Sequence, residues 1–233
     1  FELVNTMGSL MQEHLIGGQL VYPFCGADWR ADPARKAELL ALVAEINARE
    51  GHVLALSIDL GGMLVLAGDE AGLVAFEAAV PVVEERFPMR LANHAGFHTG
   101  LQEPVAQEGR ARLDGSKLRQ PQVPLIDGRG AIWQPGACDL AALWGYTLGH
   151  QVVESYDFTR AVQTAALEFA PDLFIVTGPG TTLGGAVAQS LVQESWRGIQ
   201  DKAGFKARQS EAPMLISMGD ETQRYMAAEA SSR

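Results

Sequence analysis

Apolar residues recur at steps of three and four along the first fifteen positions, which is the spacing of one face of an amphipathic helix. The members of this face are Phe1, Val4, Met7, Leu10, Met11 and Leu15. A second helix is predicted over residues 32–49, because Asp32 can cap its first turn and Pro33 suits its first position. The chain opens inside the first helical pattern, without the basic segment that begins a signal peptide. We therefore expect further polypeptide upstream of Phe1.

Between positions 19 and 94, apolar runs typical of strands alternate with helical patterns. The predicted strands are 19–25, 52–58, 63–67 and 89–94, and the predicted helices are 32–49 and 70–86. Pro81 lies inside the second of these helices and should kink or split it. The resulting order, β-α-β-β-α-β, is that of the ferredoxin-like split-βαβ fold.

The second half of the chain has a different pattern. Helices are predicted over 101–113, 139–148, 156–169 and 181–192, and strands over 123–126, 172–176 and 214–217. This alternation is typical of a parallel α/β layer. We therefore predict an α/β protein with a parallel-sheet core, formed by residues 1–17 and 95–233, and an inserted ferredoxin-like βαββαβ subdomain, formed by residues 18–94.

Hydrophobic residues make up 47% of the 233 positions and charged residues 20%, as in an ordinary globular protein. No apolar run approaches the roughly 18 residues of a membrane-spanning helix. The net charge of −10 argues against nucleic-acid binding, because phosphate contacts need clustered Lys and Arg. Two cysteines, Cys25 and Cys138, are too few for a disulfide framework and lie in apolar segments that favour inert thiols. These features predict a cytoplasmic protein that binds neither membrane nor nucleic acid.

The loop 92–100 joins the two predicted subdomains and contains His94 and His98. Histidine titrates near neutral pH, so a histidine between two subdomains is a candidate general base, with a surface or capping role as the alternative. A metal site at His94 and His98 would need a third ligand and a rigid mount, and the intervening Ala-Gly-Phe supplies neither. We therefore expect no metal.

A glycine-rich loop, residues 178–185, connects a predicted strand to a predicted helix. Free N–H groups at a helix start favour anions, so a phosphate cradle is one interpretation. The spacing matches neither the G-x-G-x-x-G fingerprint nor the P-loop. A tight turn, in which the backbone passes close to another element, is the favoured interpretation.

Several short segments, in order along the chain, form a recognisable set. They are Met11-Gln12-Glu13, Leu64-Val65-Leu66-Ala67-Gly68, Ala95-Gly96-Phe97-His98-Thr99 with Leu101 and Pro104, Pro121-Gln122-Val123-Pro124, and residues 176–183. These colinear segments cover nearly the whole chain and resemble the acyl-CoA:acyl-carrier-protein transacylases of the malonyltransferase type, which act in fatty-acid and polyketide synthesis, with the βαββαβ insert in the expected place. The resemblance implies an α/β hydrolase-like acyltransferase core.

The resemblance implies a ping-pong acyl transfer. A serine at a strand-to-helix elbow attacks the acyl-CoA thioester, and a histidine, His98 by motif, removes its proton and later activates the pantetheine thiol of an acyl carrier protein. The family's G-x-S-x-G elbow does not occur in this sequence, so the serine is expected upstream of Phe1. Acyl-CoA and acyl carrier protein are the expected partners, and no cofactor is expected beyond acyl-CoA as substrate.

Substrate-binding positions also follow from the resemblance. Malonyl-selective members carry an arginine in the first helix that pairs with the malonyl carboxylate, and Met7 stands at that place. A methionine would line an apolar pocket, which predicts weak malonyl selectivity and favours acetyl or longer uncharged acyl groups. Family polar positions match Ser57, Asp59 and Thr147, and Phe97 precedes the histidine. We expect these residues to contribute to the substrate site.

Two other functions stay open. A non-catalytic domain that docks a carrier protein or a synthase partner would need no serine, and the sequence upstream of Phe1 would decide between this and an enzyme. A thioesterase would share the serine and histidine but admit water. A basic cluster after the histidine loop is a candidate carrier-docking face, with a solvated helix end as the alternative. Its members are Arg110, Arg112, Lys117 and Arg119.

Overall fold

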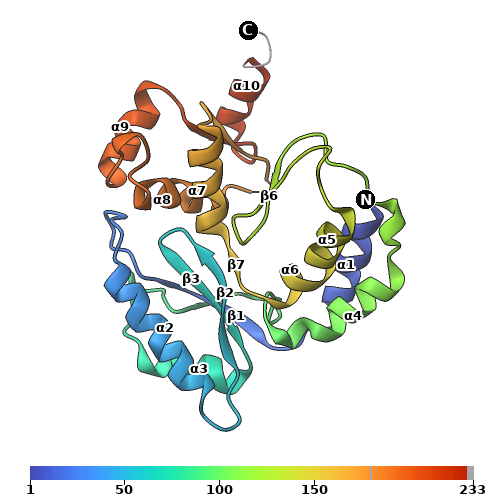
Figure 1. Cartoon of the computed structure of the whole chain (residues 1–233). Helices are drawn as coiled ribbons and strands as arrows, with labels where there is room; N and C mark the ends of the chain where they lie inside the picture. Colours follow the sequence, from blue (N-terminus) through green and yellow to red (C-terminus); the bar gives the residue numbers. More distant parts are fainter. Residues whose placement is uncertain (179, 230–233) are drawn as a thin grey trace.

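The computed structural model describes residues 1–178 and 180–229 of the chain. The first hundred residues form one helix followed by alternating strands and helices (Figure 1). These elements are α1 (Glu2–Glu13), β1 (Gly18–Pro23), α2 (Pro33–Asn47), β2 (Leu54–Leu60), β3 (Met63–Gly68), α3 (Glu70–Ala79) and β4 (Met89–Arg90).

The remaining residues are mainly helical, with short strands between the helices. Their elements are η1 (Gly100–Gln102), α4 (Glu103–Arg112), η2 (Gly115–Lys117), β5 (Leu125–Ile126), β6 (Ile132–Trp133), α5 (Leu140–Gly145), η3 (Tyr146–His150), α6 (Gln151–Val153), β7 (Tyr156–Asp157), α7 (Phe158–Phe169), β8 (Phe174–Val176), α8 (Thr182–Gln193), η4 (Trp196–Gly198), α9 (Lys202–Glu211), β9 (Leu215–Ser217) and α10 (Glu221–Glu229). The predicted α/β class is confirmed.

The main sheet has five strands in the order β4-β1-β3-β2-β7. The first four strands are antiparallel to their neighbours, and β7 adds to the edge of β2 in parallel. The order β4-β1-β3-β2 is the one that a ferredoxin-like βαββαβ unit has. The division of the chain into residues 18–94 and the two flanking segments stays a prediction.

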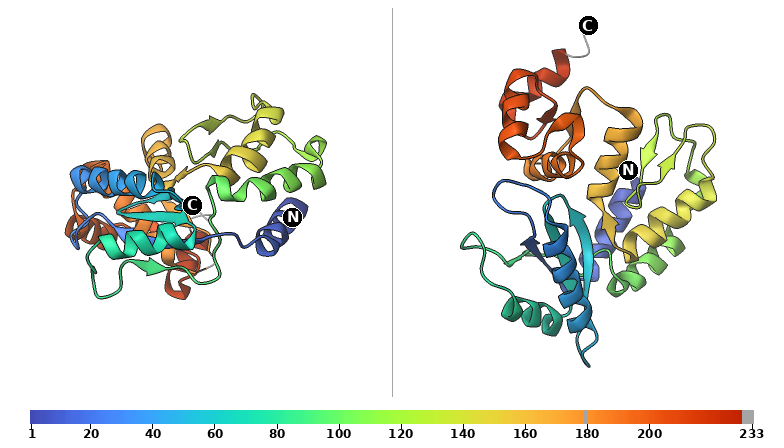
Figure 2. Two further views of the ribbon diagram at one scale, coloured as in Figure 1. Left: turned by 90° about the horizontal axis from the view of Figure 1, so that it is seen from below. Right: turned by 60° about the vertical axis from the view of Figure 1, so that its left-hand side comes forward.

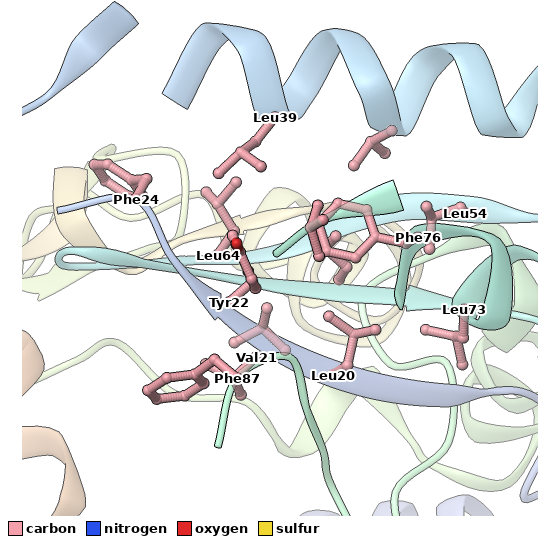
Figure 3. Packing of buried hydrophobic residues seen from close by; sticks show 14 of the residues in the cluster. Leu20, Val21, Tyr22, Phe24, Leu39, Leu54, Leu64, Leu73, Phe76 and Phe87 are labelled. Atoms are coloured by element: carbon pink, nitrogen blue, oxygen red, sulfur yellow. The ribbon is translucent and has the colours of Figure 1, made fainter. Parts of the chain in front are cut away.

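Helices α2 and α3 cover one face of this sheet, and the pattern of the strands explains why. Alternate side chains of a strand point to opposite faces. Leu20 and Tyr22 of β1 pack beneath the helices with Leu39 and Phe76, and all four are almost fully buried. Figure 3 shows Leu39 between α2 and the sheet, while Phe87 lies on the far side of the strands from α2.

The helical elements fall into two groups beside the sheet (Figures 1 and 2). Helix α1 packs against α4 through a cluster that contains Met7, Leu10 and Val105. The second group, α7 to α9, has its own cluster around Val187, Leu191 and Trp196. Within the described residues, the parallel sheet of this second half consists of two strands, β8 and β9.

The β2–β3 hairpin links the main sheet to the second helical group. At its turn, Gly61 N donates to Thr159 Oγ1 (2.8 Å) on α7, and Gly62 N donates to Gln189 Oε1 (2.6 Å) on α8. Gln193 Nε2 donates back to the Gly61 carbonyl oxygen (2.5 Å). Gly61 has a φ of 65°, a left-handed conformation that glycine adopts without strain. The turn therefore anchors the sheet onto α7 and α8.

Several predicted elements have different bounds in the structure. Helix α3 ends at Ala79, because Val80 precedes Pro81 and takes an extended conformation. The strand predicted over 89–94 is limited to Met89–Arg90. The strand predicted over 123–126 is limited to Leu125–Ile126, since Pro124 offers no N–H to a neighbouring strand. In the described part of the chain, no helix combines the length and apolar character needed to cross a bilayer.

Candidate active site

His98 lies in the loop between β4 and η1, with its backbone in the left-handed region (φ 56°). Its Nδ1 lies 2.6 Å from the carbonyl oxygen of Gln151 at the start of α6. A carbonyl oxygen only accepts hydrogen bonds, so Nδ1 is the protonated nitrogen of the neutral ring. This bond fixes the tautomer and leaves the lone pair of Nε2 available to accept a proton.

The half-buried position of His98 also changes its proton affinity. Burial lowers the pKa of the ring below its ordinary value of 6.5, because desolvation disfavours the imidazolium ion, and the Gln151 carbonyl opposes this effect. At neutral pH the ring is therefore uncharged. A neutral imidazole with one nitrogen held by a carbonyl and the other free is the form that a general base requires.

Two cavities meet at His98. The first, here called the Met7 cavity, has a volume of about 400 Å³ and lies between α1, η3 and α6. Apolar side chains provide most of its wall, among them Val4, Met7 and Met11 of α1. The cavity brings together four residues predicted from the sequence as parts of the site: Met7, Phe97, His98 and Thr147.

The second cavity, here called the sheet-face cavity, has a volume of about 620 Å³. It lies against the face of the main sheet that α2 and α3 leave uncovered, and Thr182 and Leu183 of α8 form part of its wall. Phe97 and His98 line this cavity as well as the Met7 cavity. Phe97 and His98 therefore border both spaces.

Ser57 lines neither cavity. It is fully buried at a β-bulge, where the register of β2 on β3 shifts between Leu56 and Ile58. Its hydroxyl accepts a hydrogen bond from Gln19 Nε2 (2.7 Å) and donates one to the carbonyl oxygen of Phe97 (2.7 Å). Bulges commonly redirect a side chain in this way. Ser57 thus contacts the loop that carries His98, and its predicted contact with substrate stays a prediction.

Asp59 is also buried and lines neither cavity. Its carboxylate pairs with Lys36 of α2 and accepts a hydrogen bond from Thr159 Oγ1 (2.6 Å). These contacts tie β2 to α2 and α7. Thr147 does line the Met7 cavity, but its hydroxyl donates to the Leu143 carbonyl oxygen one turn earlier (2.8 Å). The substrate contacts proposed for Asp59 and Thr147 remain predictions.

Two residues of this site were not singled out from the sequence. Gln151 contributes its backbone carbonyl, which no side-chain pattern reveals. Gln19 is 3% exposed, and its amide holds Ser57. The one available signal for Gln19 was a polar residue opening an otherwise apolar strand.

The remaining titratable candidates have other surroundings. His94 is exposed, and its Nδ1 contacts the Ala92 carbonyl oxygen (2.9 Å). The described residues contain no group of three or more His, Cys, Asp or Glu side chains that could hold a metal ion. Burial raises the pKa of the Cys25 thiol to about 11, so this cysteine stays protonated and unreactive at neutral pH. Cys138 is buried.

The glycine-rich loop after β8 makes a close backbone approach. Pro179 lies outside the described residues, while Gly178 and Gly180 both have positive φ angles. A Cβ atom on Gly219 would lie 2.1 Å from the Gly180 carbonyl oxygen, so a larger residue has no room there. This supports the interpretation of the loop as a tight turn that packs against the segment after β9.

Much of the proposed basic docking face is neutralised by neighbouring acids. Arg110 pairs with Glu103, Arg112 with Glu108, and Lys117 with Glu2. These pairs are largely exposed, so they contribute little to stability but reduce the positive field. Arg119 is exposed.

No family model matches the chain, and no curated protein matches it significantly. Solved structures do match. A malonyl-CoA:acyl carrier protein transacylase from Xanthomonas oryzae pv. oryzae is 20% identical with a TM-score of 0.66, over 98% of this chain and 63% of that protein. The corresponding enzyme of Acinetobacter baumannii is 18% identical with a TM-score of 0.67, over 98% of this chain and 63% of that protein.

A third match is a complex between a type II polyketide-synthase acyl-carrier protein and its malonyl-transacylase. It is 20% identical with a TM-score of 0.64, over 90% of this chain and 64% of that chain. The chain therefore has the fold of these transacylases, and it spans less than two thirds of the length of the structures it matches.

Proposed function

We propose that this chain is the histidine-bearing part of an acyltransferase, which moves an acyl group from coenzyme A to the pantetheine thiol of an acyl carrier protein. The observation that carries the proposal is the bond from His98 Nδ1 to the Gln151 carbonyl oxygen, which leaves Nε2 as an acceptor where two cavities meet. The transacylase fold of the chain supports it.

The proposed reaction has two half-reactions, and His98 acts in both. First, Nε2 removes the proton of a serine hydroxyl, and the serine oxygen attacks the thioester carbonyl carbon of acyl-CoA. The tetrahedral intermediate expels the coenzyme A thiolate, which takes the proton from Nε2 and leaves an acyl-serine ester. In the second half, Nε2 removes the thiol proton of pantetheine, its sulfur attacks the ester, and the serine oxygen regains the proton. No cofactor takes part in these steps.

The attacking serine, in this proposal, belongs to polypeptide that precedes Phe1. The sequence contains no G-x-S-x-G motif, and no hydrogen bond among the described residues involves His98 Nε2. The matched transacylases are longer than this chain, which spans 63% of the first of them. That extra length leaves room for a strand-to-helix elbow.

An uncharged acyl group fits the Met7 cavity better than a malonyl group. Among the described residues, neither lysine nor arginine lines this cavity. A malonyl carboxylate would leave water there without a cationic partner, which is costly in an apolar site. Met7 itself is 6% exposed and packs towards Gly109 of α4, so it forms a firm apolar wall. Acetyl or longer uncharged acyl groups are the proposed substrates.

The test is acyl loading and transfer by the full-length protein. Radiolabelled acyl-CoAs should leave an ester-bound acyl group on the protein, and holo-acyl carrier protein should remove it. His98→Ala should abolish both steps, while His52→Ala, which changes a histidine that lines neither cavity, should leave them intact. Undiminished transfer by His98→Ala would reject the assignment of the base.

A non-catalytic docking domain is the second candidate. It is favoured by the observation that no described side chain bonds to His98 Nε2, so the described residues hold no nucleophile in place. In that case the full-length protein would bind holo-acyl carrier protein but take up no label from any acyl-CoA. The same experiment therefore separates the two functions, and a release of free acid instead of acyl carrier protein ester would indicate a thioesterase.

A further inference from the structure

The proposed transfer accounts for the Met7 cavity but not for the larger sheet-face cavity beside it. One wall of that cavity consists of alternate side chains from the strands of the main sheet: Val21 of β1, Ile58 of β2, Val65 of β3 and Met89 of β4. The intervening side chains point to the opposite face, beneath α2 and α3. Apart from Gln19, the sheet side of the cavity is therefore an aliphatic surface.

Apart from His98 and the Thr182 hydroxyl on the α8 side, this cavity offers a ligand almost no hydrogen bonds. The backbone groups of β1 and β3 are engaged in the sheet ladders. The Gln19 amide donates to Ser57, and the His94 Nδ1 contacts the Ala92 carbonyl oxygen. Arg86, the one charged residue on the cavity wall in the described residues, is exposed and pairs with Glu84. An amide-rich or ionic ligand would lose its hydration there without replacement.

A hydrocarbon chain has no such penalty. The volume of about 620 Å³ lies within the range of ligand pockets in proteins and exceeds the 400 Å³ of the Met7 cavity. Because His98 and Phe97 border both cavities, a carbonyl carbon next to the imidazole can extend an attached chain into either one.

We propose that the sheet-face cavity binds the hydrocarbon tail of a medium-chain acyl thioester whose carbonyl carbon lies at His98. This rests on the proposed acyl transfer and specifies its substrate class. Short acyl groups fill the Met7 cavity alone, whereas longer tails enter the sheet-face cavity. Each methylene that leaves water should then increase affinity about fourfold.

Binding measured without chemistry tests this inference. Alkyl-pantetheine thioethers with ethyl, butyl, hexyl and octyl groups cannot be transferred, and calorimetry on the full-length protein gives their affinities. We expect affinity to rise steeply from butyl to octyl. Val65→Phe and Met89→Trp, which fill the cavity from a buried and from a more exposed position, should each weaken octyl binding at least tenfold and leave ethyl binding unchanged.

Val74→Phe is the matched control, because Val74 is an exposed apolar residue of α3, outside both cavities. It should bind all four probes as the unchanged protein does. Equal affinities for all chain lengths would overturn the inference, as would octyl binding that survives both cavity-filling variants. Loss of octyl binding in Met7→Phe alone would also overturn it, since the tail would then lie in the Met7 cavity.

The outcome is independent of the transfer assay. If chain-length-dependent binding is present but no acyl group is transferred, the proposed enzyme activity fails while the hydrocarbon site stands. If transfer occurs but binding does not depend on chain length, the reverse holds. Thermal unfolding of each variant confirms that the cavity-filling side chains leave the protein folded.

Discussion

The Ser57 hydroxyl donates a 2.7 Å hydrogen bond to the carbonyl oxygen of Phe97, the residue directly before His98. Ser57 belongs to β2 of the main sheet, whereas Phe97 belongs to the histidine loop, so this bond joins the sheet to the loop. Gln19 completes the connection by donating to the same hydroxyl. The backbone at the candidate base is thus fixed by the sheet and not by the loop alone.

Ser57→Ala should therefore weaken both stability and transfer. It leaves the Phe97 carbonyl and the Gln19 amide without their buried partner, which costs about 1–3 kcal/mol. We expect chemical denaturation to show this loss, and acyl transfer to fall with it because His98 is displaced. Ser57→Thr keeps a hydroxyl and should retain more activity than Ser57→Ala. Ser9→Ala, at an exposed position of α1, is the control.

The pH dependence of transfer should report the ionisation of His98. Burial lowers its pKa below 6.5, and only the neutral ring can accept a proton. Activity should therefore reach its plateau by neutral pH and decline in the acidic range, where the imidazolium forms. A plot of kcat/KM against pH gives this pKa. If kcat/KM instead fell with a midpoint above pH 6.5 on the acidic side, the assignment of His98 as the base would be contradicted.

The lowered pKa of His98 also makes the stability of the folded protein depend on pH. The folded state favours neutral His98, so its contribution to stability is present above pH 6.5 and is lost as the pH falls through the lowered pKa. His98→Gln should make the free energy of unfolding less dependent on pH in that range. Urea denaturation at several pH values measures this without any activity. An unchanged slope in the variant would show that other groups dominate.

Met7→Arg should move selectivity towards malonyl-CoA. A guanidinium at this position can form two charge-assisted hydrogen bonds with the malonyl carboxylate, on the order of 1.5–3 kcal/mol, or roughly 10- to 150-fold in relative kcat/KM. Met7→Lys introduces the positive charge but not the paired N–H donors of a guanidinium, so it should raise the relative kcat/KM for malonyl-CoA less. Asn5→Arg, at an exposed position of the same helix that lines neither cavity, should change the selectivity for malonyl-CoA little. Unchanged malonyl-to-acetyl ratios in Met7→Arg would disprove the position as the selectivity determinant.

Gly61→Ala should destabilise the protein more than Gly51→Ala does. Both glycines have positive φ angles, 65° and 72°, so alanine costs about 1–2 kcal/mol of backbone strain at either place. A Cβ atom on Gly61 would in addition lie 2.7 Å from the Ala186 carbonyl oxygen of α8, whereas one on Gly51 would have nothing within 4 Å. Thermal denaturation of the two variants compares them directly. Equal losses of thermal stability in the two variants would mean that the hairpin turn moves to relieve the contact between the new Cβ atom and the Ala186 carbonyl oxygen.

The sequence predicted those elements whose ends or faces carry a local signal. Asp32 caps α2 by accepting from Arg35 N, as its position before Pro33 indicates. Helix α9 was missed because Phe205 is its one buried residue, so it has no apolar period. The helical segment predicted over 139–148 continues to Val153 through a π-helical turn, η3, and no residue pattern distinguishes such a turn from regular helix.

The candidate site was predictable only in part, for a related reason. Met7, Phe97, His98 and Thr147 have side chains that a motif can identify, and the fold brings them to one cavity. The group that orients His98 is a main-chain carbonyl, which any residue could supply. Ser57 and Asp59 were also expected at the substrate; a bulge and an ion pair to Lys36 hold them outside both cavities, and their contact with substrate stays a prediction. Those are tertiary features that a linear pattern does not encode.

The short parallel sheet has a practical consequence for work with this polypeptide. Strand β8 pairs with β9 and with no other described strand, and its central residue, Ile175, is 47% exposed beside an apolar groove. Unpaired strand edges of this kind recruit foreign strands. Purified without a strand to cover β8, these 233 residues should self-associate and precipitate when the protein is concentrated. A charged side chain introduced at Ile175 should reduce this aggregation and improve solubility.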